Sequence, residues 1–369
     1  MKVLIWTELY WPSLGGTELF TMNLVNGLHR RGLEFQVVTG HPSESLPLID
    51  EVDGIAVQRL RFRAAFEKHD LSALHQVREA LFRCVRAFQP DLVHMTWLAS
   101  CGVFYHQLQD AYPIPTLISL GQHLRGDLST KSLRGRTLRR ANWVAACSSW
   151  MHESLLAAVP ELRQRTSVVY HAVPPSLAPA DTVPDGERLL CLGRLANCKG
   201  FDVALEAFAL LATRRPKSHL VIAGDGPERT RLEALAADLG IAQRVSFLGM
   251  IPPADTAAVI AQSAIVVMPS TEETFGLVAL EAAQQGRPVV ASRIEGLAEV
   301  VADGESGRLV APGDSGALAT AMLELLDDAS LRERLGRQAE ERAVRQFSWT
   351  AHLDAYEELY RRLAVSAQR

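Results

Sequence analysis

One stretch decides the fold: residues 264–286, which have the sequence AIVVMPSTEETFGLVALEAAQQG. Its first five residues are apolar and mostly β-branched, which predicts a buried strand. A Pro-Ser turn and a polar loop follow, and residues 277–285 predict a helix that Gly286 ends. Open α/β sheets bind ligands where a strand end leads through a loop into a helix. Because a helix start offers free N–H groups and a positive dipole end, this loop suits a phosphate.

The loop and the helix each carry a carboxylate with a different expected role. Glu273 stands just before the helix, where it can point into a cleft. Glu281 follows eight residues later, about two helical turns on, where its two acceptor oxygens suit ribose hydroxyls. The spacing alone leaves a second interpretation open, in which Glu273 caps the helix and Glu281 is a solvated surface residue.

Strand and helix patterns alternate along the whole chain, which predicts an α/β fold with doubly wound parallel sheets. Residues 40–70 are expected to be irregular apart from a strand at 55–59. A chain of 369 residues is long for one core, so two domains are expected. We predict a Rossmann-like domain over 1–172 and another over 188–349. The linker between them, 173–187, contains Pro174, Pro175, Pro179 and Pro184.

Composition narrows the class of protein. The apolar and charged contents, 48% and 22%, are typical of a soluble globular protein rather than a disordered or fibrous one. Residues 1–175 are slightly basic and the remainder is acidic, which favours an anionic ligand or membrane surface over nucleic acid. Five cysteines without a Cys-x-x-Cys pair indicate a reducing, cytoplasmic compartment. No signal peptide or apolar run of about 18 residues is apparent, so we expect no membrane span.

Two further loops carry groups suited to an anion. Gly15 and Gly16 lie between the first strand and a helix, where backbone can approach an anion closely, although a plain tight turn is an equal alternative. Arg194 and Lys199 share a loop after the strand at 188–192. Arg offers a planar fork for phosphate oxygens and Lys a point charge; the alternative is simple surface charge.

The sequence has no Asp-x-Asp pair and no His/Cys cluster with ligand spacing, so no metal site is expected.

The combination of these motifs resembles the Glu-x7-Glu signature of family 4 retaining glycosyltransferases (glycosyl transferases group 1). Pro-Ser, Phe-Gly-Leu, Glu-Ala and Gly-x-Pro-Val-Val occur around the two glutamates in the same register. The resemblance implies the GT-B fold, with two Rossmann-like domains facing a central cleft and a last helix, 350–369, that crosses back to the first domain. It assigns the acceptor to the first domain and the donor, a nucleoside-diphosphate sugar, to the second.

The resemblance also assigns roles to single residues. Glu273 contacts the donor sugar and Glu281 the ribose. Arg194 and Lys199, in a Gly-Arg-x4-Lys-Gly context, stabilise the departing diphosphate, and the Gly15-Gly16 loop closes over it. The floor of the base pocket is expected at Met250 and Ile251. The loop that holds the diphosphate comprises Thr274, Phe275, Gly276 and Leu277.

The sequence departs from the family at two places. Many relatives carry a histidine at the position of Gly121, and the nearest histidine here is His123. His123 either takes over that catalytic role or is an ordinary loop residue; both remain open. Relatives often have Asn-Gly-Val-Asp where this chain has His171-Ala172-Val173-Pro174. That change is expected to alter the interdomain turn and not the chemistry.

The implied activity is the metal-independent transfer of a hexose, with retention, to a hydroxyl acceptor in glycan, polysaccharide or glycolipid biosynthesis. The donor base, the sugar and the acceptor are not determined by the sequence. Two alternatives are a donor-binding but inactive subunit, which Gly121 makes possible, and a GT-B sugar-nucleotide epimerase.

Residues 125–140 contain six basic side chains and one acidic one. They form either a solvated helix face or a patch for anionic lipid or an acceptor diphosphate, with the protein peripheral on the inner membrane face.

Overall fold

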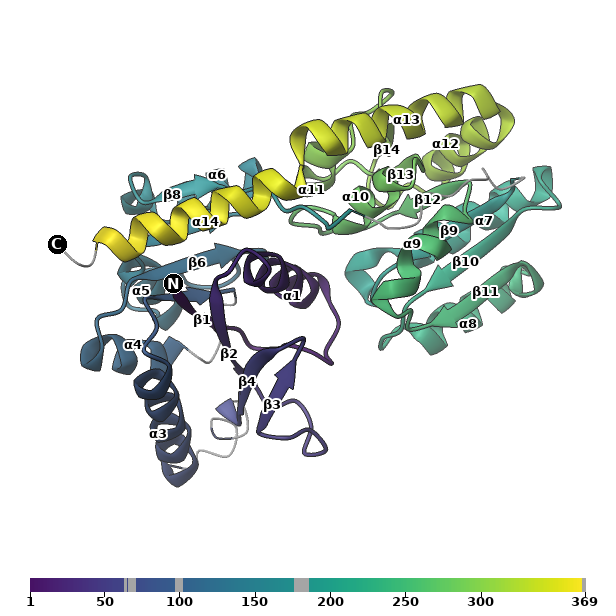
Figure 1. Ribbon diagram of the computed structural model, residues 1–369. Coiled ribbons are helices and arrows are strands. Elements are labelled where there is room, and N and C mark those ends of the chain that lie inside the picture. The colour runs from purple at the N-terminus through teal and green to yellow at the C-terminus, as the bar shows by residue number, and fades with distance from the viewer. Residues whose placement is uncertain (63–64, 66–70, 97–101, 176–185, 367–369) are drawn as a thin grey trace. The chain divides into compact units, whose positions relative to one another are not determined.

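The computed structural model describes residues 1–62, 65, 71–96, 102–175 and 186–366 (Figure 1). The chain forms two compact units, Met1–His171 with Thr350–Arg369 and Ala172–Trp349. Most of the predicted linker, 176–185 with Pro179 and Pro184, lies outside the described residues. Each unit has its own sheet and core.

The first unit contains an eight-stranded sheet in the order β3-β4-β2-β1-β5-β6-β7-β8. β5 and β6 are buried at every residue, as expected of parallel strands covered by helices on both faces. Neighbouring strands pair in parallel, apart from β3, which is antiparallel to β4. The strands are β1 (Lys2–Trp6), β2 (Glu34–Gly40), β3 (Ile49–Val52), β4 (Ile55–Leu60), β5 (Leu92–Met95), β6 (Thr116–Leu120), β7 (Trp143–Ala146) and β8 (Thr166–Val168).

The helices of the first unit alternate with these strands. Two of them have serine N-caps: Ser132 accepts a hydrogen bond from the amide of Gly135, and Ser148 from that of Met151. The α-helices are α1 (Gly16–His29), α3 (Leu71–Phe88), α4 (Gly102–Ala111), α5 (Leu133–Arg140), α6 (Ser149–Ala158) and, from the end of the chain, α14 (Trp349–Ser366).

A buried polar network joins α14, yellow in Figure 1, to the sheet of the first unit. The His94 ring lies 2.7 Å from the Tyr360 hydroxyl through Nδ1 and 2.7 Å from the Ser119 hydroxyl through Nε2. The same Ser119 hydroxyl lies 2.8 Å from that of Tyr356. Desolvation, and then the charge of His352, lower the pKa of His94 to about 3. The imidazole is therefore neutral, with both nitrogens satisfied.

The second unit contains a six-stranded, all-parallel sheet in the order β11-β10-β9-β12-β13-β14. Its strands are β9 (Arg188–Leu192), β10 (His219–Ala223), β11 (Val245–Gly249), β12 (Ile265–Met268), β13 (Val289–Ser292) and β14 (Gly307–Val310). Its α-helices are α7 (Phe201–Arg214), α8 (Arg229–Asp238), α9 (Pro253–Ala261), α10 (Leu277–Gln284), α11 (Glu295–Val300), α12 (Ser315–Asp327) and α13 (Ala329–Gln346). One apolar core lies between the sheet and α7 and α12, built from side chains such as Phe208, Ile222 and Met322.

Both sheets reverse direction next to their first strand. In the second unit the chain builds outward from β9 to β10 and β11, then returns to add β12 on the other side of β9. Val266 of β12 is therefore in register with Leu190 of β9. The loops that leave β9 and β12 emerge side by side at the carboxyl edge, which is the position where such sheets bind ligands.

The predicted fold class, doubly wound α/β with parallel sheets, is confirmed. One strand was missed: β3 lies in the region 40–70 that was expected to be irregular. It is an edge strand whose residues are exposed or half-buried, Ile49-Asp50-Glu51-Val52, so it has no run of apolar residues to reveal it. Among the described residues, no helix combines the length and the apolar character that a bilayer span needs.

Candidate active site

The two loops at the reversal of the second sheet are joined by an ion pair. Lys199, after β9, and Glu273, after β12, form a salt bridge between Nζ and Oε1, with side chains 24% and 14% exposed. The same Glu273 oxygen accepts a hydrogen bond of 3.4 Å from the Ser270 hydroxyl. The sequence predicted separate contacts to the donor for Lys199 and Glu273; the structure brings the two together.

Backbone contacts hold these loops against each other. The amide of Thr271 donates a 2.9 Å hydrogen bond to the carbonyl of Cys198. Gly200 adopts a left-handed conformation, with φ of 64°, and a Cβ there would lie 2.1 Å from the carbonyl oxygen of Pro269. Only glycine permits this close approach. The position of Lys199 relative to Glu273 is therefore fixed by the main chain.

The N-terminus of α10 lies on the same loop and has no side-chain cap. Its N-cap is Gly276, and the first turn contains no acidic residue. Glu273 therefore does not cap the helix, contrary to one of the two interpretations of the sequence. The Phe275 side chain is buried against the ring of Phe347, 5.4 Å away between centroids. This leaves the backbone of 275–277 as the part of the loop that can bind an anion.

Glu281 occupies an unusual environment in the middle of α10. The residue is half-buried, and its carboxyl has no hydrogen bond or ion pair within the part of the chain that the structure describes. Desolvation raises the pKa of this carboxyl to about 7. A half-buried carboxyl without a partner among the described residues is a candidate for hydrogen bonds from a ligand.

The remaining predicted donor residues of the second unit lie at the same edge of the sheet. Arg194 is exposed, on the loop after β9, where the amide of Leu195 is held by the carbonyl of Asp225 at 2.9 Å. Met250 and Ile251 follow β11; Met250 is 56% exposed and Ile251 is half-buried. Cations, apolar side chains, the start of α10 and the carboxylate of Glu273 therefore share one edge.

In the first unit, Gly15 and Gly16 lead from β1 into α1, as predicted. Gly15 is the extended N-cap of α1. Glu18, in the first turn, is buried, and a Cβ on Gly15 would lie 2.4 Å from its Oε2. A carboxylate of the chain thus already stands at this helix N-terminus, where it interacts favourably with the helix dipole.

The structure places His171, and not His123, beside Gly121. A Cβ on Gly121 would lie 3.0 Å from His171 Nε2 and 4.0 Å from the Thr17 hydroxyl. Desolvation, and then the charge of His352, lower the pKa of His171 to about 3, so its ring is neutral. His123 instead packs edge-on against Trp150, with ring centroids 5.3 Å apart. His171 was not among the site residues predicted from the sequence. Two departures from the family, Gly121 in place of a histidine and His171 in place of an asparagine, were the signal that could have revealed it.

Several basic side chains of 125–140 are engaged within the first unit. Arg139 donates to the carbonyls of Leu128 and Gly135 and pairs with Glu161, and Arg140 pairs with Asp110. Arg134 donates to the carbonyl of Arg125. Lys131 and Arg136 are exposed.

In the described residues, no group of three or more His, Cys, Asp or Glu side chains is arranged to hold a metal ion. The fold is that of a two-domain α/β protein in which the Lys199–Glu273 pair and the start of α10 lie at the carboxyl edge of the second sheet. Two family models cover the chain: Glycosyltransferase Family 4 matches residues 14–177, and Glycosyl transferases group 1 matches residues 179–342.

Curated relatives agree with these matches. The lipopolysaccharide core biosynthesis glycosyltransferase LpsE of Rhizobium meliloti (strain 1021) is 32% identical over 360 residues, covering 97% of this chain and 98% of that protein. The D-inositol 3-phosphate glycosyltransferase 2 of Catenulispora acidiphila is 43% identical over 188 residues, covering 48% of this chain and 44% of that protein. The chain belongs to glycosyltransferase family 4, also described as glycosyl transferases group 1.

Solved structures share the fold. Sucrose-phosphate synthase from Thermosynechococcus elongatus superimposes with a TM-score of 0.83 at 24% identity, over 99% of this chain and 100% of that one. Anabaena HepE, solved with UDP-glucose, gives a TM-score of 0.82 at 21% identity, over 98% and 100%. The predicted GT-B fold is confirmed, and the chain is a glycosyltransferase.

The Lys199–Glu273 pair predicts an energetic coupling that a double-mutant cycle measures. In urea unfolding of Lys199→Met, Glu273→Gln and the double variant, we expect a coupling free energy of about 1–3 kcal/mol, because each single change leaves a half-buried charged or polar group without its partner. The exposed Arg337–Glu333 pair, at 4.0 Å, is the control and should couple by less than about 0.5 kcal/mol. Equal coupling in the two pairs would contradict the structural role given to the first.

Proposed function

We propose that this glycosyltransferase moves a hexose from a nucleoside-diphosphate sugar to a hydroxyl acceptor, with retention of anomeric configuration and without a metal ion. The observation that carries the proposal is the ion pair of Lys199 with Glu273 beside the uncapped start of α10. A fixed cation next to the start of a helix matches a diphosphate, and a carboxylate on the same loop matches sugar hydroxyls.

Each group then has a defined task in the transfer. Lys199 and Arg194 neutralise the charge that develops on the departing diphosphate, the role a metal ion plays in other transferases. The backbone of 275–277, with Thr274, holds the phosphates. Glu281 accepts hydrogen bonds from the ribose hydroxyls, and Met250 and Ile251 line the base site. Glu273 orients the donor sugar while it holds Lys199.

The chemistry is a front-face displacement. The acceptor oxygen forms a bond to the anomeric carbon on the side from which the diphosphate leaves, and the bond from that carbon to the phosphate oxygen breaks. The proton of the acceptor hydroxyl passes to the same phosphate oxygen. Because the new bond forms on the face of the old one, the configuration is retained without a protein nucleophile.

The acceptor belongs, in this proposal, to the first unit and to a lipopolysaccharide or polysaccharide pathway. Support comes from relatives named for lipopolysaccharide core biosynthesis that align over nearly the full chain. Thr17, in the first turn of α1, lies near Gln122, after β6, and His171, after β8; Gln122 Nε2 donates to the Thr17 hydroxyl at 3.3 Å. A neutral His171 suits an acceptor hydroxyl. Catalysis by His123 stays a prediction.

A second candidate is a donor-binding subunit that lacks turnover, and the observation in its favour is Gly121 in place of a histidine. Incubation with UDP-glucose and glycans or lipid-linked acceptors distinguishes the two, because only a transferase consumes donor in an acceptor-dependent manner. An epimerase would convert the donor sugar with no acceptor present.

The donor site predicts selective stabilisation by one nucleotide. In a thermal-shift panel of UDP, GDP, ADP and their sugar conjugates, one base should raise the melting temperature equally with magnesium and with EDTA. At 100 times its dissociation constant, a ligand adds about 2.7 kcal/mol of apparent stability. Lys199→Ala should abolish the shift, whereas the exposed control Lys217→Ala should keep it. A panel without any shift would remove the basis for the transferase proposal.

Glu281 predicts a pH dependence of donor affinity. A carboxyl with a pKa of about 7 is largely protonated at pH 6 and largely ionised at pH 8, and only the carboxylate can accept from both ribose hydroxyls. Affinity for the sugar nucleotide, measured by calorimetry, should therefore rise from pH 6 to pH 8. Glu281→Gln should weaken binding at pH 8 by about tenfold and flatten the profile. A profile that is unchanged in Glu281→Gln would assign the titration to another group.

We further propose that the exposed basic residues of 125–140 hold the enzyme peripherally on an anionic, cytoplasmic membrane face. Each cation near such a surface contributes about 1 kcal/mol. The double variant Lys131→Gln, Arg136→Gln should lose most of its co-sedimentation with phosphatidylglycerol vesicles at low salt, while Arg334→Gln, in the other unit, should not. Retention of binding by the double variant would exclude this patch.

A further inference from the structure

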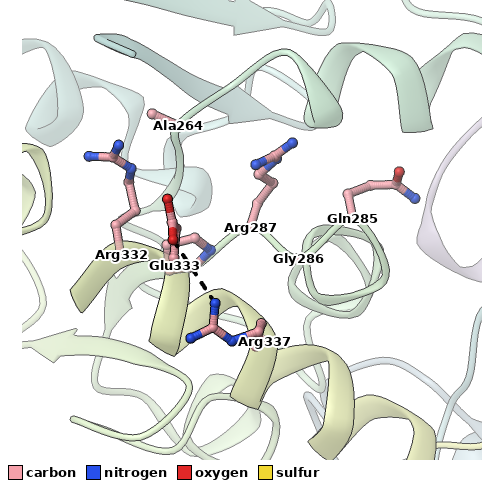
Figure 2. A pocket seen from close by; sticks show the side chains of 8 residues that line it. Ala264, Gln285, Gly286, Arg287, Arg332, Glu333 and Arg337 are labelled. Carbon is pink, nitrogen blue, oxygen red and sulfur yellow. Dashed lines mark ion pairs between the residues drawn. The ribbon is translucent and has the colours of Figure 1, made fainter. Parts of the chain in front are cut away.

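A second anion-compatible cavity lies in the same unit, away from the donor loops. It has a volume of about 210 Å³ and is open to solvent on one side. Figure 2 shows its walls: the turn after α10, with Gln285 and Arg287, and the first three turns of α13, with Arg332, Glu333 and Arg337. A pocket for a drug-sized molecule is larger, about 300–1,000 Å³, so this cavity suits a small ligand.

The cavity concentrates positive charge in the acidic half of the chain. Three guanidinium groups line it against one carboxylate. Glu333 pairs with Arg337 at 4.0 Å, with both side chains largely exposed, so the pair is weak and screened. In Figure 2, Arg332 and Arg287 extend to either side of Glu333. The site has a formal excess of two positive charges.

Two of the arginines are held in place by the surrounding structure. Arg287 is 5% exposed, and desolvation together with the charge of Arg332 lowers its guanidinium pKa. Arg332 donates from Nη1 to the carbonyl of Leu325 at 2.8 Å. Its Nε is buried and has no hydrogen-bond partner among the residues that the structure describes. An oxyanion would satisfy this donor and relieve the repulsion between the two cations.

Local backbone makes the cavity rigid. Gly336 of α13 packs directly on the turn, because a Cβ there would lie 2.0 Å from the carbonyl oxygen of Gly286. The amides of Gly286 and Arg287 close the end of α10 by donating to the carbonyls of Ala283 and Ala282, each at 2.9 Å. The arginines therefore project from two elements with a fixed separation, as preorganised binding requires.

The cavity is distinct from the donor site. Arg287 precedes β13 and Ala264 precedes β12, so the cavity is at the amino edge of the sheet, whereas Lys199 and Glu273 are at the carboxyl edge. α10 connects the two, with its start at the donor loop and its end at the cavity. Its eight residues span about 12 Å.

We propose that this cavity is a second binding site, specific for a phosphate or phosphomonoester group, held by Arg332, Arg337 and Arg287. The group fits the size and the charge: it is small, carries nearly two negative charges at pH 7, and presents several acceptor oxygens to planar guanidinium donors. Both a lipid headgroup and a soluble metabolite can carry such a phosphate group, and the test distinguishes these two sources. The inference does not depend on the proposed donor.

The test is calorimetric titration with inorganic phosphate at constant ionic strength, in a Lys199→Ala background that disables the donor loops. We expect one phosphate per chain. Arg332→Gln and Arg337→Gln should each weaken binding by about tenfold or more. The control is Arg334→Gln, an exposed residue of the same helix that bonds Gln338 and is not part of the cavity wall, and it should bind as the parent does. Arg337 is 67% exposed, so its replacement tests the site without endangering the fold.

The proposal would be overturned if phosphate did not bind, or if Arg332→Gln and Arg337→Gln bound it as tightly as the parent protein. It would also be overturned if sodium chloride produced the same heat as phosphate. Glycerol 3-phosphate and vesicles containing phosphatidic acid distinguish the sources: binding of the first in solution assigns a metabolite, and arginine-dependent co-sedimentation with the second alone assigns a lipid. Phosphate binding in a protein that no nucleotide stabilises would leave this site standing and remove only the donor proposal.

Discussion

The second unit depends on one topological constraint, the return of the chain to the far side of β9. A parallel sheet that builds outward in two directions from its first strand must send two neighbouring loops from the same edge. Here those loops meet so closely that Gly200 lies against the carbonyl of Pro269, with no room for a side chain. The ion pair between Lys199 and Glu273 lies beside that contact, and α10 begins on the same loop as Glu273.

α10 carries two groups that are unfavourable without a ligand. A half-buried carboxyl with a raised pKa and a helix start without a side-chain cap both lack the partners that a folded chain usually provides. Stability alone does not explain them, since a neutral residue in place of Glu281 would avoid the desolvation. The free-energy cost of these two groups is explained if they are retained for ligand binding rather than for folding stability.

The sequence predicted the sheets well because buried parallel strands are continuous apolar runs, and β12 and α10 were placed with their observed bounds to within a residue. It also named Lys199, Glu273 and Glu281 individually as candidate residues of the donor site. It did not predict that Lys199 and Glu273 pair, because 74 positions separate them and only the strand order brings them together. The sequence did not predict the approach of His171 to Gly121 or of Arg332 to Arg287, because these residues are also far apart in the chain. β3 escaped because an exposed edge strand lacks the apolar signal.

The attachment of α14 has a consequence for the order of events during synthesis. His94 and Ser119 acquire their hydroxyl partners, Tyr360 and Tyr356, from a segment that the ribosome makes only after the entire second unit. A nascent first unit therefore lacks α14 and the hydroxyl partner of His94 Nδ1, while the second unit consists of residues that are continuous in the chain. The half of the protein that is translated later is in a position to finish folding first.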